Sequence, residues 1–133
     1  AGAEFIVSPG LVPDVVASAR QVGVAVRPGA LTPTELMHAM AMGADMVKIF
    51  PAQAVGGASY IRALRGPFPG ALLVPTGGVA LETVGDFIRA GAAAVGVGSE
   101  LIARDALERG DYSAIGSLAR KFVAAVRVAR STG

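Results

Sequence analysis

The sequence predicts an α/β fold with a parallel sheet, of the (β/α)8-barrel type, with about five βα units. Three observations support this prediction. Short runs rich in β-forming residues alternate with stretches whose apolar residues recur at helical spacing. A glycine closes several of the helical stretches just before the next strand, and every strand ends in Pro or Gly. Strands that alternate with helices form right-handed βαβ units, which make the strands parallel.

The strands are expected in five short apolar runs. They are bounded by turn-forming residues. The runs are "AEFIVSP" (3–9), "VAVRPGA" (24–30), "DMVKIFPA" (45–52), "ALLVPTGG" (71–78) and "AAAVGVGS" (92–99).

The helices are expected between and after these runs, at 11–22, 33–42, 58–65, 81–90 and 112–130. The second has the strongest start signal: Thr32 as N-cap, Pro33 as first helical residue and Glu35 as the acid of a capping box. Gly23, Gly43 and Gly91 end three of the helices, because glycine tolerates the left-handed conformation of a helix end.

Five βα units suit either an open, flavodoxin-like sheet or part of a barrel. Two features favour the barrel. The Pro and Gly residues gather at the C-terminal strand ends, where barrels carry their functional residues. In addition, "PTGG" followed by "GVGS" is similar to the phosphate cradle found after the last two barrel strands.

Composition narrows the class of protein. The chain has 133 residues, 53% hydrophobic and 17% charged, which predicts a single folded domain rather than a disordered chain. The net charge of +2 is too small and scattered for nucleic-acid binding. No apolar run could span a bilayer, so we expect no membrane partner and a cytoplasmic location. Without cysteine, and with His38 as its one histidine, the sequence predicts no disulfide and no metal site.

Lys48 is the first candidate for chemistry, because it interrupts the apolar run "MVKIFPA". Alternation along a strand places Met46, Lys48 and Phe50 on one face and Val47 and Ile49 on the other. A lysine kept from water can act as a neutral nucleophile and form a Schiff base with a carbonyl substrate. From the strand pattern alone, a strand-end lysine with its amine in solvent, or paired with a carboxylate, is the simpler explanation.

Glycine turns after two consecutive strands form the second candidate site. Gly77 and Gly78 follow one strand, and Gly98 and Ser99 the next. Glycine lets backbone N–H groups approach an anion, so the two turns predict phosphate binding, although each alone reads as an ordinary tight turn. Thr76 precedes them on the strand, and its hydroxyl could bind substrate or cap its own turn.

Taken together, several segments resemble the 2-keto-3-deoxy-6-phosphogluconate (KDPG) aldolases and the overlapping 4-hydroxy-2-oxoglutarate (KHG) aldolases. The resemblance runs from Gly2 to about Val126. Its segments are "GAEFIVSPGLVPDVV", "RPGALTPTEL", "VKIFPAQAVGG", "IRALRGPFPG", "VPTGG" and "AVGVGSELI". One departure is Gln53, where the family usually has glutamate.

The resemblance implies a (β/α)8 barrel, a class I (Schiff-base) aldolase reaction without metal or other cofactor, and a homo-oligomer, usually a trimer. It implies that Lys48 is the Schiff-base lysine and that Thr76 lies at the pyruvyl site. Gly77, Gly78, Gly98 and Ser99 then bind the phosphate. The substrate implied is a phosphorylated 2-keto-3-deoxy sugar acid, cleaved to pyruvate and glyceraldehyde 3-phosphate. KHG and phosphogalactonate substrates stay open.

The resemblance also predicts that residues 1–133 correspond to the C-terminal two-thirds of the family barrel. The first three βα units, with the general acid/base and the groups that hold the pyruvate carboxylate, would lie outside it. Three hypotheses follow: a class I aldolase or its C-terminal part, a phosphate-binding or self-associating fragment without full catalysis, and a non-enzymatic assembly scaffold. Capture of pyruvate on Lys48 separates them.

Overall fold

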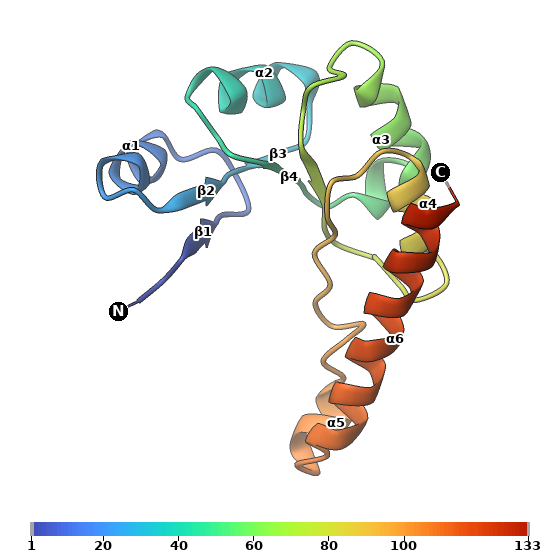
Figure 1. The fold of residues 1–133 in the computed structure, drawn as a ribbon. Coiled ribbons are helices and arrows are strands. Elements are labelled where there is room, and N and C mark those ends of the chain that lie inside the picture. The colour runs from blue at the N-terminus through green and yellow to red at the C-terminus, as the bar shows by residue number, and fades with distance from the viewer. Residues whose placement is uncertain (1, 133) are drawn as a thin grey trace.

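A computed structural model describes residues 2–132 as short parallel strands with helices between them (Figure 1). The predicted parallel α/β arrangement is confirmed, since every strand pair is parallel. In chain order the elements are β1 (Phe5–Val7), α1 (Pro13–Gln21), β2 (Ala25–Arg27), β3 (Gly29–Ala30), α2 (Pro33–Ala41), β4 (Val47–Ile49), a 3₁₀ turn (Gln53–Val55), α3 (Ala58–Arg65), β5 (Leu73–Pro75), α4 (Val84–Arg89), α5 (Arg104–Glu108) and α6 (Tyr112–Ser131).

The strands are neighbours in the order in which they occur along the chain. β1 pairs with β2, and β3, β4 and β5 pair in sequence. The expected strand 24–30 is split into β2 and β3 at Pro28, which has no N–H to donate. Backbone bonds from Asp45 to the Val26 carbonyl and from Lys48 to the Pro28 carbonyl carry the pairing across this break. A flavodoxin-like sheet would place its first strand between the second and third, so the consecutive order favours a barrel wall.

The prediction of a strand over 92–99 is wrong. Only one parallel bridge forms there, between Thr76 and Gly96. The Ala93 and Gly96 N–H groups do bond to the Leu73 and Pro75 carbonyls, so the segment runs beside β5. Alanine and glycine have weak strand preference, and in the described residues nothing pairs with its other edge. The segment therefore runs alongside β5 without forming a regular strand.

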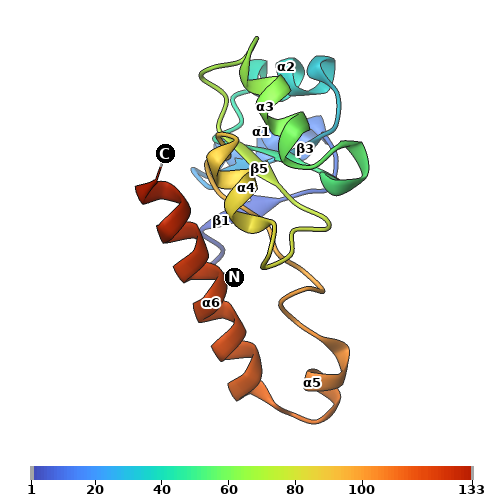
Figure 2. The ribbon, with the colours of Figure 1, turned by 90° about the vertical axis from the view of Figure 1, so that its right-hand side faces the viewer.

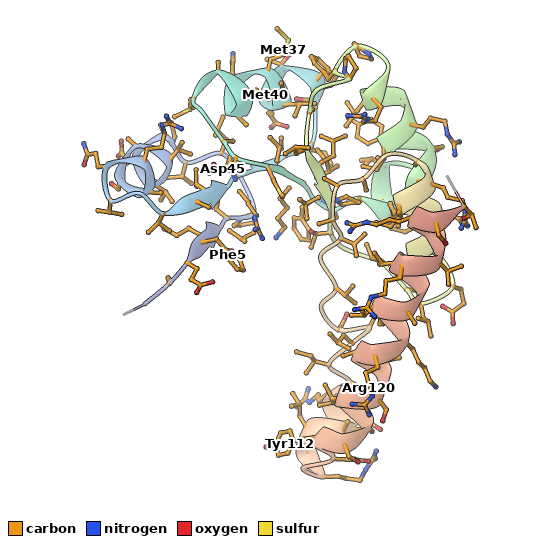
Figure 3. The ribbon with its side chains drawn as sticks, in the orientation of Figure 1. Phe5, Met37, Met40, Asp45, Tyr112 and Arg120 are labelled. Carbon is orange, nitrogen blue, oxygen red and sulfur yellow. The ribbon has the colours of Figure 1, made fainter. Side chains whose placement is uncertain are left out.

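The core lies between the strands and the helices that cover one of their faces. Val47, Ile49 and Leu73 point into it and are almost completely buried. The helices contribute Leu36, Ile61 and Phe87 among other residues. Figure 3 shows Met37 and Met40 of α2 on one side of the strands and Phe5 of β1 on the other. Phe5 and Val7 are about half exposed, at 49% and 46%.

The C-terminal part extends away from this body. α6 packs on α4, burying Phe122 and Ala129 in the main core. α5 was not expected from the sequence; with the first turns of α6 it projects beyond the strands in both ribbon views (Figures 1 and 2). Within residues 2–132, none of the helices combines the length and the apolar character needed to cross a membrane.

Candidate active site at the strand ends

Lys48 lies in the middle of β4, and its neighbours fix its direction. Val47 and Ile49 are 2% and 0% exposed beneath the helices. Lys48 therefore points to the opposite face, as the alternation predicts. Its Nζ lies 4.6 Å from the centroid of the Phe50 ring, two residues farther along the chain. The amine is held against an aromatic face, that of Phe50, which follows the C-terminal end of β4.

The face that carries Lys48 is hollowed into a cavity of about 320 Å³. It is mostly apolar, and its lining includes three of the six residues predicted from the sequence: Lys48, Thr76 and Gly98. The other residues that line it are Phe5, Val7, Arg27, Val74, Val95, Gly96 and Val97. A volume of this size fits a small ligand of a few carbon atoms.

Thr76 enters the cavity just beyond β5, where Gly96 makes room for it. A Cβ on Gly96 would lie 2.3 Å from the Thr76 Oγ1, a distance that no side chain tolerates. The Thr76 hydroxyl donates to the Val74 carbonyl at 3.3 Å, a long hydrogen bond that leaves its lone pairs free. Gly96 was not singled out from the sequence; the signal was a glycine inside an expected strand, which often marks a close approach.

The loop after β4 is tied to the glycine turn after β5. The Ala52 N–H donates to the Thr76 carbonyl at 2.8 Å, and the Gln53 N–H to the Gly77 carbonyl at 3.1 Å. Gly78 has φ +74°, and a Cβ there would lie 2.4 Å from the Gln53 Cβ. These contacts hold the lysine strand and the first predicted phosphate turn as one unit.

The second predicted phosphate turn is held less firmly. Gly98 and Ser99 are exposed, and a Cβ on Gly98 would meet nothing within 4 Å. The carbonyl of Gly98 accepts the N–H groups of Leu101 and Ile102, which closes a turn. Among residues 2–132, no acceptor takes the N–H groups of Gly78, Gly98 or Ser99. The Thr76–Gly96 bridge brings the two glycine turns close together, at the C-terminal ends of β5 and of the segment beside it.

A family model described as KDPG and KHG aldolase matches residues 1–118 of the chain. The chain belongs to this aldolase family. The 2-dehydro-3-deoxy-phosphogluconate aldolase of Dickeya dadantii is 40% identical over 124 residues, covering 93% of this chain and 58% of the relative. The KHG/KDPG aldolase of Escherichia coli is 39% identical over 92% of this chain and 58% of its own length. This chain therefore spans a little over half the length of these relatives.

The KDPG aldolases are also structural neighbours. The enzyme of Legionella pneumophila, solved with pyruvate captured as a covalent carbinolamine, superposes with a TM-score of 0.80 and 30% identity. The superposition covers 88% of this chain and 57% of the Legionella chain. The resemblance inferred from the motifs is thus confirmed, as is an α/β fold of the type found in these aldolases.

Two other polar residues, Glu35 and His38, lie outside the lining of the cavity. Glu35 completes a capping box: its carboxylate accepts the Leu31 and Thr32 N–H groups at 2.7 and 2.8 Å. These backbone hydrogen bonds, from Leu31 first and then Thr32, lower the pKa of Glu35 below its usual 4.5. His38 is exposed on α2, away from the lining of the cavity. In the described residues, His, Asp and Glu form no cluster of three or more that could hold a metal ion.

Arg27 is a charged residue of the cavity that was also not singled out from the sequence. Its guanidinium carbon lies 4.2 Å from the centroid of the Phe5 ring. The signal was present in the sequence: Arg27 is a charged residue in an apolar strand directly before a proline, as Lys48 is a charged residue near Pro51.

Proposed function

We propose that this chain carries the Schiff-base site of a class I aldolase and forms the corresponding part of a (β/α)8 barrel. The substrate is 2-keto-3-deoxy-6-phosphogluconate, cleaved to pyruvate and glyceraldehyde 3-phosphate, with 4-hydroxy-2-oxoglutarate as a second candidate substrate. One observation carries the proposal: the Lys48 amine stands in a mostly apolar cavity shared with the Thr76 hydroxyl. The covalent pyruvate adduct of the Legionella relative supports it.

The chemistry follows from the amine. Nζ of Lys48 adds to the C2 carbonyl of the 2-keto acid, and loss of water gives an iminium. When the C4 hydroxyl gives up its proton, the C3–C4 bond breaks, its electron pair moves toward the iminium, and glyceraldehyde 3-phosphate leaves. The remaining enamine takes a proton at C3, and hydrolysis releases pyruvate and the free amine. The Thr76 hydroxyl can hydrogen-bond the pyruvyl group during these steps.

The two glycine turns are proposed to bind the phosphate of the substrate. Unoccupied N–H groups at Gly78, Gly98 and Ser99 are suited to phosphate oxygens, and Gly77 sets the turn that presents them. These turns follow β5 and its neighbouring segment, beyond the level of Lys48. A sugar acid attached to Lys48 through C2 can therefore extend its phosphorylated end toward them.

A second function, binding without efficient turnover, is favoured by one observation. None of the residues that line the cavity is a carboxylate or a histidine. General acid/base catalysis typically contributes about 10²–10⁴-fold, so this chain alone should turn over slowly even when it forms the imine. Self-association, with a trimer as the resemblance implies, is proposed as well, because among the described residues β1 is paired on one edge only, and an open strand edge can pair with another chain. Sedimentation of the chain under assay conditions measures its oligomeric state and tests this proposal.

Borohydride reduction in the presence of pyruvate tests the proposed site. The sequence contains only two lysines, Lys48 and Lys121, so Lys121→Met is a matched control. We expect one pyruvate adduct on the Lys48 peptide, no adduct there in Lys48→Met, and normal labelling in Lys121→Met. Labelling that persists in Lys48→Met would contradict the proposal. A coupled dehydrogenase assay on the same samples separates turnover from imine formation alone.

A further inference from the structure

The side chain of Gln53 packs against the first of the two glycine turns proposed to bind phosphate. A Cβ on Gly78 would collide with the Gln53 Cβ and lie 3.0 Å from its Cγ, so the stem of Gln53 fills the space beside this glycine. At Gly77 the nearest atoms belong instead to Phe50 and Pro51. Among these neighbours of the turn, Gln53 has the one polar side chain.

The backbone fixes where Gln53 lies relative to this turn. Its N–H donates to the Gly77 carbonyl at 3.1 Å, which joins the loop after β4 to the turn after β5. Within the loop, the Gly57 N–H donates to the Ala52 carbonyl at 3.0 Å. Gly57 has φ +59°, a conformation that favours glycine, so the loop can close this tightly. The Gln53 side chain therefore starts from a backbone that is held on both sides.

The amide end of Gln53 reaches the start of α3. A Cβ on Gly57, the N-cap of this helix, would lie 2.9 Å from the Gln53 Oε1 and 3.7 Å from its Nε2. Gln53 and Gly78 are both exposed, so an anion that approaches the turn from solvent passes close to this amide. The amide is neutral, whereas the carboxylate of a glutamate, which has nearly the same shape, is charged. Charge is therefore the property through which this position can act on an anion.

We propose that Gln53 is a specificity-determining residue of the phosphate site. This inference rests on the proposed function. The stem of Gln53 supports the turn at Gly78, and its uncharged end keeps this edge of the site free of a negative charge that would repel phosphate. Like charges a few ångströms apart oppose binding, and between exposed groups salt screens the repulsion. Gln53 thereby favours a substrate with a phosphorylated end over one whose far end is uncharged.

Calorimetric titration with inorganic phosphate tests this role. At about pH 8 and 0.1 M salt, we expect Gln53→Glu to weaken binding about 10-fold, because the carboxylate and the phosphate are then both negatively charged. Gln53→Met keeps an unbranched, uncharged side chain beside Gly78 and should stay within about 3-fold of the unsubstituted chain. Ala54→Glu is the matched control. It places the same charge on the next exposed residue of the loop and should cost clearly less than Gln53→Glu.

Salt separates the effect of charge from an effect of shape. Raising the salt from about 0.1 M to 1 M shortens the screening length from ~10 Å to ~3 Å, so the loss in Gln53→Glu should shrink to about 2-fold. An unchanged affinity in Gln53→Glu, an equal loss in Gln53→Met, or a loss that salt does not relieve would overturn the role of Gln53 and leave the proposed function standing.

The unsubstituted chain distinguishes failure of this inference from failure of the proposed function. If it binds no phosphate but still captures pyruvate on Lys48, the proposed phosphate site is overturned, and the role of Gln53 with it. If it captures no pyruvate, the proposed aldolase site is overturned, while the phosphate titrations still decide whether Gln53 controls anion binding at the turn.

Discussion

The two glycine turns of the proposed phosphate site differ in how they are held. The turn at Gly77 and Gly78 receives backbone hydrogen bonds from the loop after β4, and a side chain at Gly78 would collide with Gln53. The turn at Gly98 and Ser99 is exposed, has free space around Gly98 and follows a segment joined to β5 by a single bridge.

This difference indicates that the two turns have different roles in the proposed site. The first turn is tied by backbone hydrogen bonds to the loop that follows the Lys48 strand, so in the proposed site it would position the anion relative to the amine. The second turn offers free N–H groups but little rigidity of its own. A site assembled in this way should be sensitive to backbone changes on one side and tolerant of them on the other.

Alanine substitutions at Gly78 and Gly98 test most directly whether the two turns are held differently. Gly78→Ala forces a non-glycine residue to φ +74° and brings its Cβ to 2.4 Å from the Gln53 Cβ. We expect the free energy of unfolding to fall by about 2 kcal/mol or more. Gly98→Ala should change it by no more than about 0.5 kcal/mol. Urea denaturation followed by circular dichroism measures both, and equal destabilisation would show that the turns are held alike.

Anion affinity gives the next largest expected effect. Gly77 has φ +88°, and a Cβ there would lie 3.1 Å from the Phe50 ring, so Gly77→Ala displaces the turn. We expect phosphate binding to weaken at least about 10-fold, since a hydrogen bond to a charged group is worth about 1.5–3 kcal/mol. Ser99→Ala removes one hydroxyl, worth about 1 kcal/mol or roughly 5-fold. Calorimetric titration with inorganic phosphate tests the order, and a larger effect at Ser99 would contradict it.

A double-mutant cycle on Gly96 and Thr76 tests whether the bridge between the two regions positions the Thr76 hydroxyl. Gly96→Ala should push the Thr76 hydroxyl out of place and slow pyruvate trapping about 5-fold, the loss of one hydrogen bond. In a Thr76→Ala background the same substitution should cost much less, which gives a coupling of about 1 kcal/mol. Additive effects in the cycle would mean that Gly96 acts by another route than Thr76.

The smallest expected effect is on the stability of the fold at acid pH. It comes from Glu35 of α2, which lies outside both turns. Backbone hydrogen bonds lower the folded-state pKa of Glu35, so its stabilisation is complete above the ordinary value of 4.5. It is lost as the pH falls below 4.5 through the lowered pKa. Glu35→Gln should be slightly less stable at pH 7 and show a flatter loss of stability between about pH 5 and 3. Thermal melts across this range test it, and an unchanged pH profile would argue against the assignment.

Much of the fold was readable because local signals and tertiary structure agree. The capping box at Thr32 and Glu35 starts α2 where the sequence predicts, and the predicted range 58–65 is that of α3. The direction of Lys48 was also fixed locally, because strand alternation left it on the face opposite Val47 and Ile49. Lys48 and the glycine turns could be singled out for the same reason: they break an otherwise regular apolar pattern.

Other features were decided only by packing between distant segments. Residues 92–99 have the composition of a weak strand, and whether they pair depends on a neighbour on each side. Gly96 could not be assigned a role until Thr76 was placed against it, nor Gly78 until Gln53 was. Arg27 reads like any strand-end arginine until β1 and β4 bring Phe5 and Lys48 to the same cavity. The sequence by itself determined which residues could do chemistry, because residue type and periodicity are local properties. The tertiary structure decided which of these residues meet, because the parallel register of the strands brings together residues that are far apart in the chain.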